Sequence, residues 1–229
     1  KREVTLTSAT DSKVYDGTAL KKDAVTVSGD GFADGEGASY DVTGTQTDVG
    51  TSDNRFTYTL NEGTKAENYA ITQVEGTLTV TALTDKVTVT ITENSDTTTY
   101  DGKEHTIEGY TVEISNPLYK EDDFSLDGVA TAKGTDAGTY NMELKPENFS
   151  NTNANFANVE FVIKDGTLEI AKAPLTVKTD SANKVYDGEP LTAGGTIEGL
   201  VNGEKVEFRT TGSQTEVGSS PNTYEIIWP

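Results

Sequence analysis

Short stretches in which apolar and polar residues alternate are the main pattern along the chain. Residues 4–7, 56–60 and 87–91 are clear examples, and threonine fills many of their polar positions. A period of two, combined with β-branched and aromatic residues, is typical of strands that bury one face. Clusters of Gly, Asp and Asn separate these stretches every ~8 to 12 residues and are typical of turns. The pattern predicts an all-β fold made of short strands.

The first 82 residues illustrate the expected elements. Seven strands fit into them, and the best helical pattern, at residues 64–68, is no longer than one turn. Such a density of short strands is typical of a β-sandwich. The expected strands lie near residues 3–9, 13–16, 24–28, 39–47, 54–60, 69–74 and 77–81.

The sequence Tyr-Asp-Gly occurs three times in similar surroundings. The occurrences begin at Tyr15, Tyr100 and Tyr186, and they are therefore 85 and 86 residues apart. A recurrence this regular indicates a tandem array of one small domain. We expect three repeats, which span residues 1–82, 83–171 and 172–229.

Two further landmarks follow each Tyr-Asp-Gly sequence in the same order. The first ends in glycine, at Gly50, Gly138 and Gly218. The second closes the repeat with Gly-Thr-Leu-Thr-Val at residues 76–80 and with a similar sequence at residues 166–170. It does not return after Gly218. The third repeat is therefore expected to be truncated at its C-terminus and to lack about two strands.

A truncated sandwich exposes unpaired strand edges and apolar core surface. In the third repeat this surface would include Ile226, Ile227 and Trp228. We expect residues 172–229 either to be the least stable part of the chain or to be completed by strand pairing with a neighbouring molecule.

The repeat length and the strand pattern favour tandem immunoglobulin-like β-sandwiches, with β-grasp-like repeats as the alternative. The junctions between repeats, at residues 80–84 and 170–176, contain no Gly or Ser. A flexible linker would be rich in both. We therefore expect stiff junctions and a chain that extends to about 100 Å.

Composition excludes several classes of partner. The formal net charge is −20, with 18 Lys and Arg against 38 Asp and Glu. Nucleic-acid binding depends on clustered basic residues, so no nucleic-acid partner is expected. No apolar stretch approaches the ~18 residues of a membrane span, so we expect no membrane insertion in this fragment. The chain has no cysteine and hence no disulfides, which points weakly to a bacterial source.

Candidate catalytic chemistry is sparse. His105 is the only histidine and occurs in one repeat of three, and thiol nucleophiles are absent. The acidic loops at residues 30–36 and 121–127 could offer oxygen ligands to Ca²⁺, but neither matches the Asp-x-Asp-x-Asp-Gly pattern. We interpret them as solvated turn acids. No catalytic, cofactor-binding or metal site and no cofactor are expected.

The Tyr-Asp-Gly sequence itself is interpreted as architecture. Asp-Gly is a turn signal, because Gly adopts positive φ and Asp can accept a hydrogen bond from its own backbone. Gly17, Gly102 and Gly188 are therefore predicted to have φ above zero. The tyrosine ring is expected to pack inward while its hydroxyl finds a partner.

Taken together, these sequences resemble the MBG or YDG-type repeats of bacterial surface proteins and adhesins. The resemblance covers the whole chain, and several of its landmarks recur in order. It rests on Lys-Val-Tyr-Asp-Gly-x-x-Leu, Asn-Tyr-x-Ile, Gly-Thr-Leu-Thr-Val and Lys-Ala-Pro-Leu-Thr-Val. The second repeat departs from the pattern, with Thr99 before Tyr100 and Lys103-Glu104-His105 where an apolar residue is usual. The resemblance implies an extracellular, cell-wall-associated stalk or adhesion module and no catalytic residues.

The expected function is therefore that of a non-enzymatic stalk or spacer, outside the cell and attached to the cell surface, whose constant partners are its neighbouring repeats. Two alternatives remain open. One is a module that binds a host glycan or protein, which exposed aromatics such as Tyr40, Tyr110, Tyr119 or Trp228 on one face would favour. The other is an accessory region of a secreted enzyme. In each case the export signal and anchor are expected to lie outside this sequence.

Overall fold

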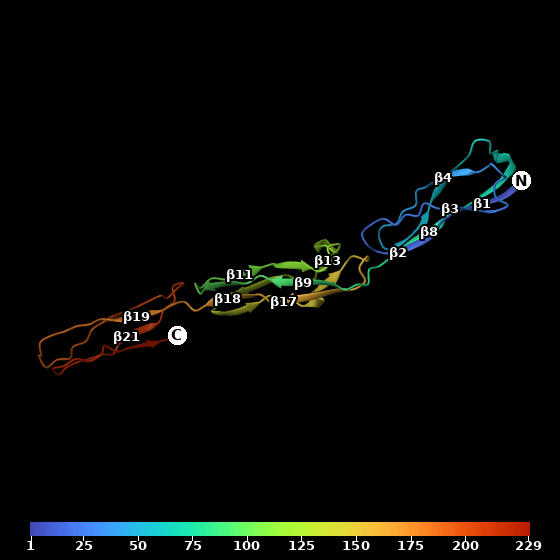
Figure 1. Cartoon of the computed structure of the whole chain (residues 1–229). Coiled ribbons are helices and arrows are strands. Elements are labelled where there is room, and N and C mark those ends of the chain that lie inside the picture. Colours follow the sequence, from blue (N-terminus) through green and yellow to red (C-terminus); the bar gives the residue numbers. More distant parts are fainter. The chain divides into compact units, whose positions relative to one another are not determined.

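The computed structural model describes all 229 residues, 1–229, and shows an all-β chain (Figure 1). It contains 22 short strands and three single-turn 3-10 helices, η1 to η3. None of the helices has the length and apolar character needed to cross a membrane. The all-β prediction is confirmed.

The chain forms two compact units, and each is described by itself. The first unit comprises Lys1–Ile91, Val112–Gly128 and Lys145–Ile163. The second comprises Thr92–Thr111, Val129–Leu144 and Lys164–Pro229. The sequence-based division into three repeats stays a prediction, and below the word repeat refers to those sequence segments.

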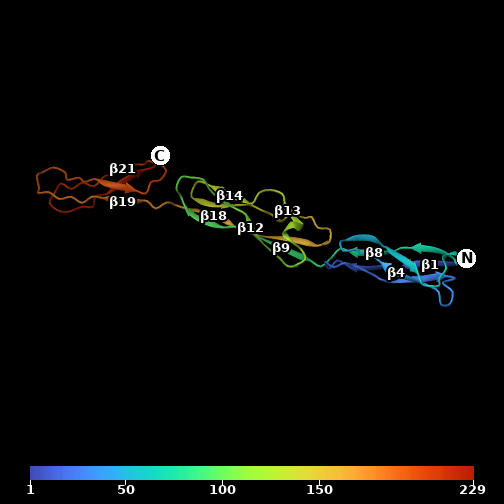
Figure 2. The same ribbon diagram turned by 90° about the horizontal axis from the view of Figure 1, so that it is seen from above.

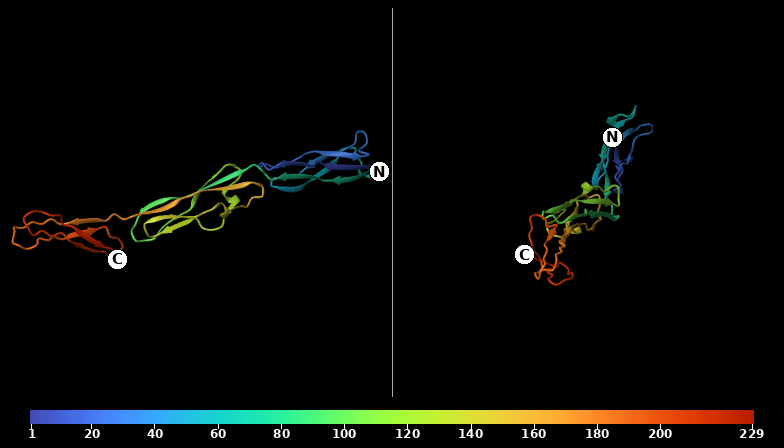
Figure 3. Two further views of the ribbon diagram at one scale, coloured as in Figure 1. Left: turned by 90° about the horizontal axis from the view of Figure 1, so that it is seen from below. Right: turned by 90° about the vertical axis from the view of Figure 1, so that its left-hand side faces the viewer.

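The first repeat lies in the first unit, where its strands run alongside one another (Figure 3). Two three-stranded sheets, with orders β3-β1-β7 and β2-β8-β5, and the pair β4-β6 make up the repeat. The elements are β1 (Arg2–Ser8), β2 (Asp11–Val14), β3 (Val25–Gly29), β4 (Ala38–Val42), β5 (Gly50–Asn54), β6 (Phe56–Leu60), η1 (Ala66–Asn68), β7 (Tyr69–Val74) and β8 (Gly76–Thr81).

Both three-stranded sheets combine parallel and antiparallel pairs. The central strand β1 is antiparallel to β3 and parallel to β7, with Arg2 opposite Tyr69. The central strand β8 is parallel to β2 and antiparallel to β5. The first strands of the repeat therefore pair with its last strands. The sequence pattern did not predict this parallel pairing, and the choice between immunoglobulin-like and β-grasp-like topology stays a prediction.

The core of the first repeat follows the alternation in its sequence. Val4 and Leu6 of β1 are fully buried and pack with Phe56 and Tyr69. A second cluster is formed by Leu20 with two residues of β8, Leu78 and Val80. Because successive side chains of a strand point to opposite faces, the intervening threonines stay at the surface.

Most of the strands predicted for the first repeat are present, but the region around Gly50 was predicted wrongly. The expected strand at residues 39–47 ends at Val42, and β5 (Gly50–Asn54) forms as a strand of its own. Residues 50–54 read Gly-Thr-Ser-Asp-Asn and contain no apolar side chain, so they carry no alternation signal. Pairing with β8 makes them a strand.

The second repeat uses the same arrangement, although its residues are shared between the two units. Its sheets have the orders β12-β9-β17 and β10-β18-β15, and β11-β14 and β13-β16 are two-stranded. The elements are β9 (Val87–Glu93), β10 (Asp96–Thr99), β11 (His105–Glu108), β12 (Tyr110–Ile114), η2 (Glu121–Asp123), β13 (Phe124–Leu126), β14 (Thr131–Gly134), β15 (Gly138–Asn141), η3 (Pro146–Asn148), β16 (Phe149–Asn151), β17 (Val159–Lys164) and β18 (Thr167–Ala171).

The third repeat lies in the second unit and has only two-stranded sheets, β19-β20 and β21-β22. The last strand leads to the C-terminus, which lies near β21 (Figure 2). The absence of a sheet like β2-β8-β5 agrees with the missing closing sequence, and the predicted low stability of this repeat stays a prediction. The strands are β19 (Thr176–Thr179), β20 (Gly195–Glu198), β21 (Glu207–Thr210) and β22 (Tyr224–Ile227).

A buried asparagine holds one end of the first repeat's second sheet, where β5 ends and β2 and β8 begin. The Asn54 side chain is fully buried, and its Nδ2 donates hydrogen bonds to the carbonyl oxygens of Ala9 and Lys22, each at 2.9 Å. Ser8 Oγ donates to the carbonyl of Asn54 and accepts from the N–H of Gly76 at 2.9 Å. The entry of β8 into the sheet therefore depends on this polar contact.

Replacing Asn54 by leucine should destabilise the first repeat by about 2–4 kcal/mol, because two partly buried carbonyl oxygens lose their donor. The matched control is Asn222→Leu, whose equivalent side chain in the third repeat is partly exposed and should matter less. Hydrogen exchange resolved along the chain measures both. Equal protection of β1 and β8 in the Asn54 variant and the unsubstituted chain would contradict this account.

Candidate functional site

The three Tyr-Asp-Gly turns share one backbone conformation. Gly17, Gly102 and Gly188 have φ of 79°, 75° and 81°. In each turn the aspartate Oδ1 accepts a hydrogen bond from the backbone N–H two residues later, at 2.9, 3.0 and 3.0 Å. The predicted positive φ and the predicted aspartate turn are both confirmed.

A basic side chain stands beside the aspartate in every turn, but its identity changes. Lys13 Nζ lies 2.6 Å from Asp16 Oδ1, and the equivalent lysine of the third repeat lies 2.7 Å from Asp187 Oδ1. The hydrogen bond from each lysine is the main reason why the pKa of its aspartate carboxyl is lowered. All of these groups are at the surface, so the contacts fix the turn rather than add much stability.

In the second repeat Thr98 stands where the lysine would be, and His105 takes over its role. His105 Nε2 lies 2.8 Å from Asp101 Oδ1, and this contact is the main cause that lowers the pKa of Asp101. His105 occupies the sequence position of Leu20. His105 thus compensates for Thr98 at the lysine position, and the only histidine of the chain has a structural partner.

In the first unit the Tyr-Asp-Gly turn of the first repeat contacts residues of the second. The Tyr15 ring packs edge-on against Phe156, with centroids 5.5 Å apart. A Cβ atom at Gly17 would lie 3.0 Å from Leu118. The tyrosine therefore packs against the following repeat, as well as lying beside the Leu20 cluster of its own.

Asn155 makes the polar part of the same contact. Its Nδ2 donates to Asp48 Oδ1 at 3.0 Å, and its Oδ1 accepts from the backbone N–H of Val49 at 2.7 Å. Its carbonyl accepts from the N–H of Leu83 at 2.8 Å, and Leu83 in turn accepts from Ala157 at 2.9 Å. The Asn155 side chain is only 8% exposed. It thus joins the loop before Gly50 to the junction at residues 80–84.

The second unit contains the corresponding contact between the second and third repeats. The Tyr100 hydroxyl donates to the Glu204 carboxylate, and this bond is the main cause that raises the pKa of Tyr100. Asn202, which has φ of 52°, donates from Nδ2 to the carbonyl of Gly102 at 3.2 Å. In both units, therefore, the Tyr-Asp-Gly turn contacts loops of the repeat that follows.

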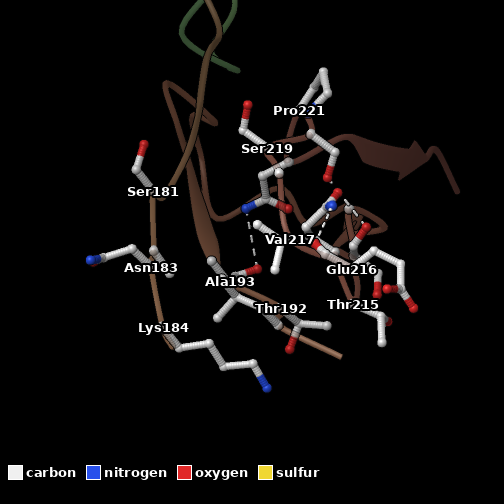
Figure 4. A pocket seen from close by; sticks show the side chains of 18 of the residues that line it. Ser181, Asn183, Lys184, Thr192, Ala193, Thr215, Glu216, Val217, Ser219 and Pro221 are labelled. Carbon is white, nitrogen blue, oxygen red and sulfur yellow. Dashed lines mark hydrogen bonds between the residues drawn. The ribbon is translucent and has the colours of Figure 1, made fainter. Parts of the chain in front are cut away.

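The third Tyr-Asp-Gly turn has no such neighbour. Val185 and Tyr186 are 89% and 57% exposed, and the space beside Gly188 is open. Next to this turn lies a cavity of about 620 Å³, lined by residues 180–186, 191–193 and 212–222. Figure 4 shows Asn183 and Lys184 on one side of it and Val217 and Pro221 on the other.

The other predicted candidates have structural roles. Asp30 Oδ2 accepts from the N–H of Glu3 at 3.0 Å, and Asp123 Oδ2 accepts from the N–H of Lys120 at 2.8 Å. The Glu36 carboxylate accepts the hydroxyl of Tyr69. These acids of the two loops therefore hold the local backbone. No group of three or more His, Cys, Asp or Glu side chains is placed to hold a metal ion.

The four aromatic residues considered for ligand binding differ in exposure. Tyr119 is 1% exposed, and burial raises its pKa to about 12. Tyr40 packs against the first core cluster, and Tyr110 is half-buried. Only Trp228, 60% exposed, offers a large open ring. The sequence pattern did not reveal that Tyr119 is buried.

We expect His105→Leu to raise the pKa of Asp101 toward the ordinary ~3.9 and the double variant Thr98→Lys/His105→Leu to lower it again. The hydrogen bond from His105 is the main cause that lowers the pKa of Asp101, so its loss removes that stabilisation of the carboxylate. A carboxyl whose pKa is lower in the folded than in the unfolded state stabilises the fold at pH values above its unfolded pKa. This stabilisation is lost as the pH falls through the folded pKa. NMR titration of the carboxyl carbons measures the shift, with Asp16 as the internal control. An Asp101 titration that is identical in all three chains would exclude the compensation.

Comparison with known families finds a match for one part of the chain. Residues 87–172 match the family model described as MBG domain. No curated protein and no solved structure matches the chain. The matched range contains β9 to β18 together with the second Tyr-Asp-Gly turn and its closing strand. The match confirms the resemblance to MBG-type repeats over residues 87–172.

Proposed function

We propose that the chain is a non-enzymatic spacer of a bacterial surface protein, which holds a functional region away from the cell wall. MBG domains are typical of bacterial surface proteins, and this supports a repeat module located outside the cell. The spacer role is carried by one observation: in each unit a Tyr-Asp-Gly turn makes specific contacts with the repeat that follows.

These contacts combine chemistry that resists bending at a junction. The Tyr15–Phe156 ring contact is edge-on, an arrangement that aromatic pairs favour. Asn155 uses both its amide donor and its amide acceptor on residues 48 and 49. Because two hydrogen bonds and a ring contact must break together, the linked segments should move as one body. A flexible linker would show none of these contacts.

The remaining surface supports the same role. The net charge of −20 keeps an exposed chain soluble and resists self-association. Asp30 and Asp123 of the two acidic loops accept backbone hydrogen bonds, and His105 is engaged by Asp101. Host glycan or protein binding remains a separate proposal, and Trp228 is the residue at which to test it.

The absence of cysteine allows a direct test with two introduced labels. Spin labels at Asp41→Cys and Ser125→Cys, both exposed and both in the first unit, should give one narrow distance distribution. Adding Asn155→Ala should broaden it, whereas the exposed control Asn61→Ala should not. A broad distribution in the chain with Asn155 intact would remove the observation on which the spacer role depends.

Location is tested separately. Antibodies against the chain should label intact source cells as strongly as permeabilised ones. Labelling that requires permeabilisation would reject a surface location while leaving the junction measurement unaffected.

A further inference from the structure

The contact between the second and third repeats includes an asparagine that is followed by glycine. Asn202 Nδ2 donates to the carbonyl of Gly102 at 3.2 Å, at the long end of the range for such hydrogen bonds. A Cβ atom at Gly102 would lie 2.3 Å from Asn202 Cβ, so the asparagine side chain lies directly against the Tyr-Asp-Gly turn. Both residues belong to the second unit. A change in the Asn202 amide therefore acts on this contact.

Asn202 and Gly203 form the tip of a tight turn. Their φ angles are 52° and 73°, and the N–H of Glu204 donates to the carbonyl of Val201 at 2.9 Å. Positive φ at both central residues is the pattern of a type I′ turn, in which Asn-Gly is a favoured pair. The hydrogen bond that closes the turn uses the N–H of Glu204. It leaves the amide nitrogen of Gly203 unengaged next to the Asn202 side chain.

This arrangement favours spontaneous deamidation of the asparagine. The Gly203 amide nitrogen attacks Asn202 Cγ, a bond forms between these atoms, and the bond from Cγ to Nδ2 breaks. The Gly203 amide proton leaves with Nδ2 as ammonia. Water then opens the cyclic imide at one of its two carbonyls and leaves aspartate or isoaspartate, with no oxidant and no enzyme. Glycine has no side chain to hinder ring closure, so an Asn-Gly sequence is especially labile.

The contact between the first and second repeats is protected against the same reaction. Asn-Gly occurs only once in the chain, and Asn155 of the first contact is followed by Phe156, which is 2% exposed. The Asn155 amide is also fixed at both ends, because Nδ2 donates to Asp48 at 3.0 Å and Oδ1 accepts from Val49 at 2.7 Å. A bulky, packed neighbour and a fixed amide both oppose ring closure. The two contacts therefore differ in chemical durability.

The product of deamidation would oppose the second contact. A carboxylate has no hydrogen to donate to the Gly102 carbonyl, so two acceptor oxygens would face each other. The new charge would also enter acidic surroundings. The Glu204 carboxylate accepts the Tyr100 hydroxyl, and the charges of Asp136 and Asp101 act on the same hydroxyl. Like charges repel, and isoaspartate would in addition lengthen the main chain of the turn by one carbon.

We propose that Asn202 is a site of spontaneous deamidation, and that its conversion releases the loop at residues 201–204 from the second Tyr-Asp-Gly turn. The first contact would stay stiff with age while the second would loosen. The modification itself does not depend on the spacer function, whereas its consequence for stiffness rests on that proposed function and adds a slow, irreversible change to it.

The modification is measured by peptide mapping of the full chain after incubation at mildly alkaline pH. The peptide that contains Asn202 should gain about 1 Da and separate into an aspartyl and an isoaspartyl form, whereas the peptide that contains Asn155 should keep its mass. Isomerisation at the Asp-Gly sequences leaves the mass unchanged and is not confused with this result. An Asn202 amide that persists in the folded chain while the urea-unfolded chain loses it would overturn the proposal.

The consequence is measured with spin labels at Glu169→Cys and Thr196→Cys, which are both exposed and both in the second unit. Ageing the labelled chain, or adding Asn202→Asp, should broaden the distance distribution, and aspartate is tolerated in a type I′ turn. The control Asn183→Asp adds the same charge at an exposed position outside the contact and should not. A distribution that Asn202→Asp leaves unchanged, or one already broad with the amide intact, would overturn the proposal. Labels in the first unit would still test the spacer role independently.

Discussion

The pairing of the closing strand is the interaction on which the repeat structure depends. β8 and β18 each lie between two strands that are distant in sequence, and each satisfies both of them. β8 also brings Leu78 and Val80 into the core. In the third repeat the flanking sequences are present, but without a central strand they stay outside any sheet. Local β propensity is therefore insufficient here, and the non-local partner decides whether a strand forms.

The repeats solve the same local problems with different residues. In the first repeat Ser8 Oγ receives the N–H of Gly76, whereas in the second the buried Glu93 carboxylate receives the N–H of Gly166 at 2.9 Å. The turn aspartate is met by lysine in two repeats and by His105 in the other. What is retained is the hydrogen-bond requirement of the backbone, because an unpaired buried polar group is costly.

Much of the fold could be predicted from the sequence, since alternation and turn residues report directly on half-buried strands. The repeat period and the positive φ of Gly17 were predicted for this reason. β5 was missed because Gly50–Asn54 has no apolar residue and becomes a strand only through β8. The parallel pairs and the contact between Tyr15 and Phe156 were out of reach, because they join segments whose proximity no local pattern encodes. The cavity of the third repeat was only partly predictable, through the missing closing sequence of that repeat.

The parallel pairing of first and last strands determines how a repeat responds to mechanical load. In the first repeat β1 runs parallel to β7 and β2 parallel to β8. A pulling force enters at the start of β1 and leaves at the end of β8, so it slides parallel neighbours past each other in shear. The hydrogen bonds of a sheared pair must break together rather than one after another. Resistance to such a force is set by the unfolding rate rather than by equilibrium stability, so a small cysteine-free domain can withstand tension that its modest core alone would not.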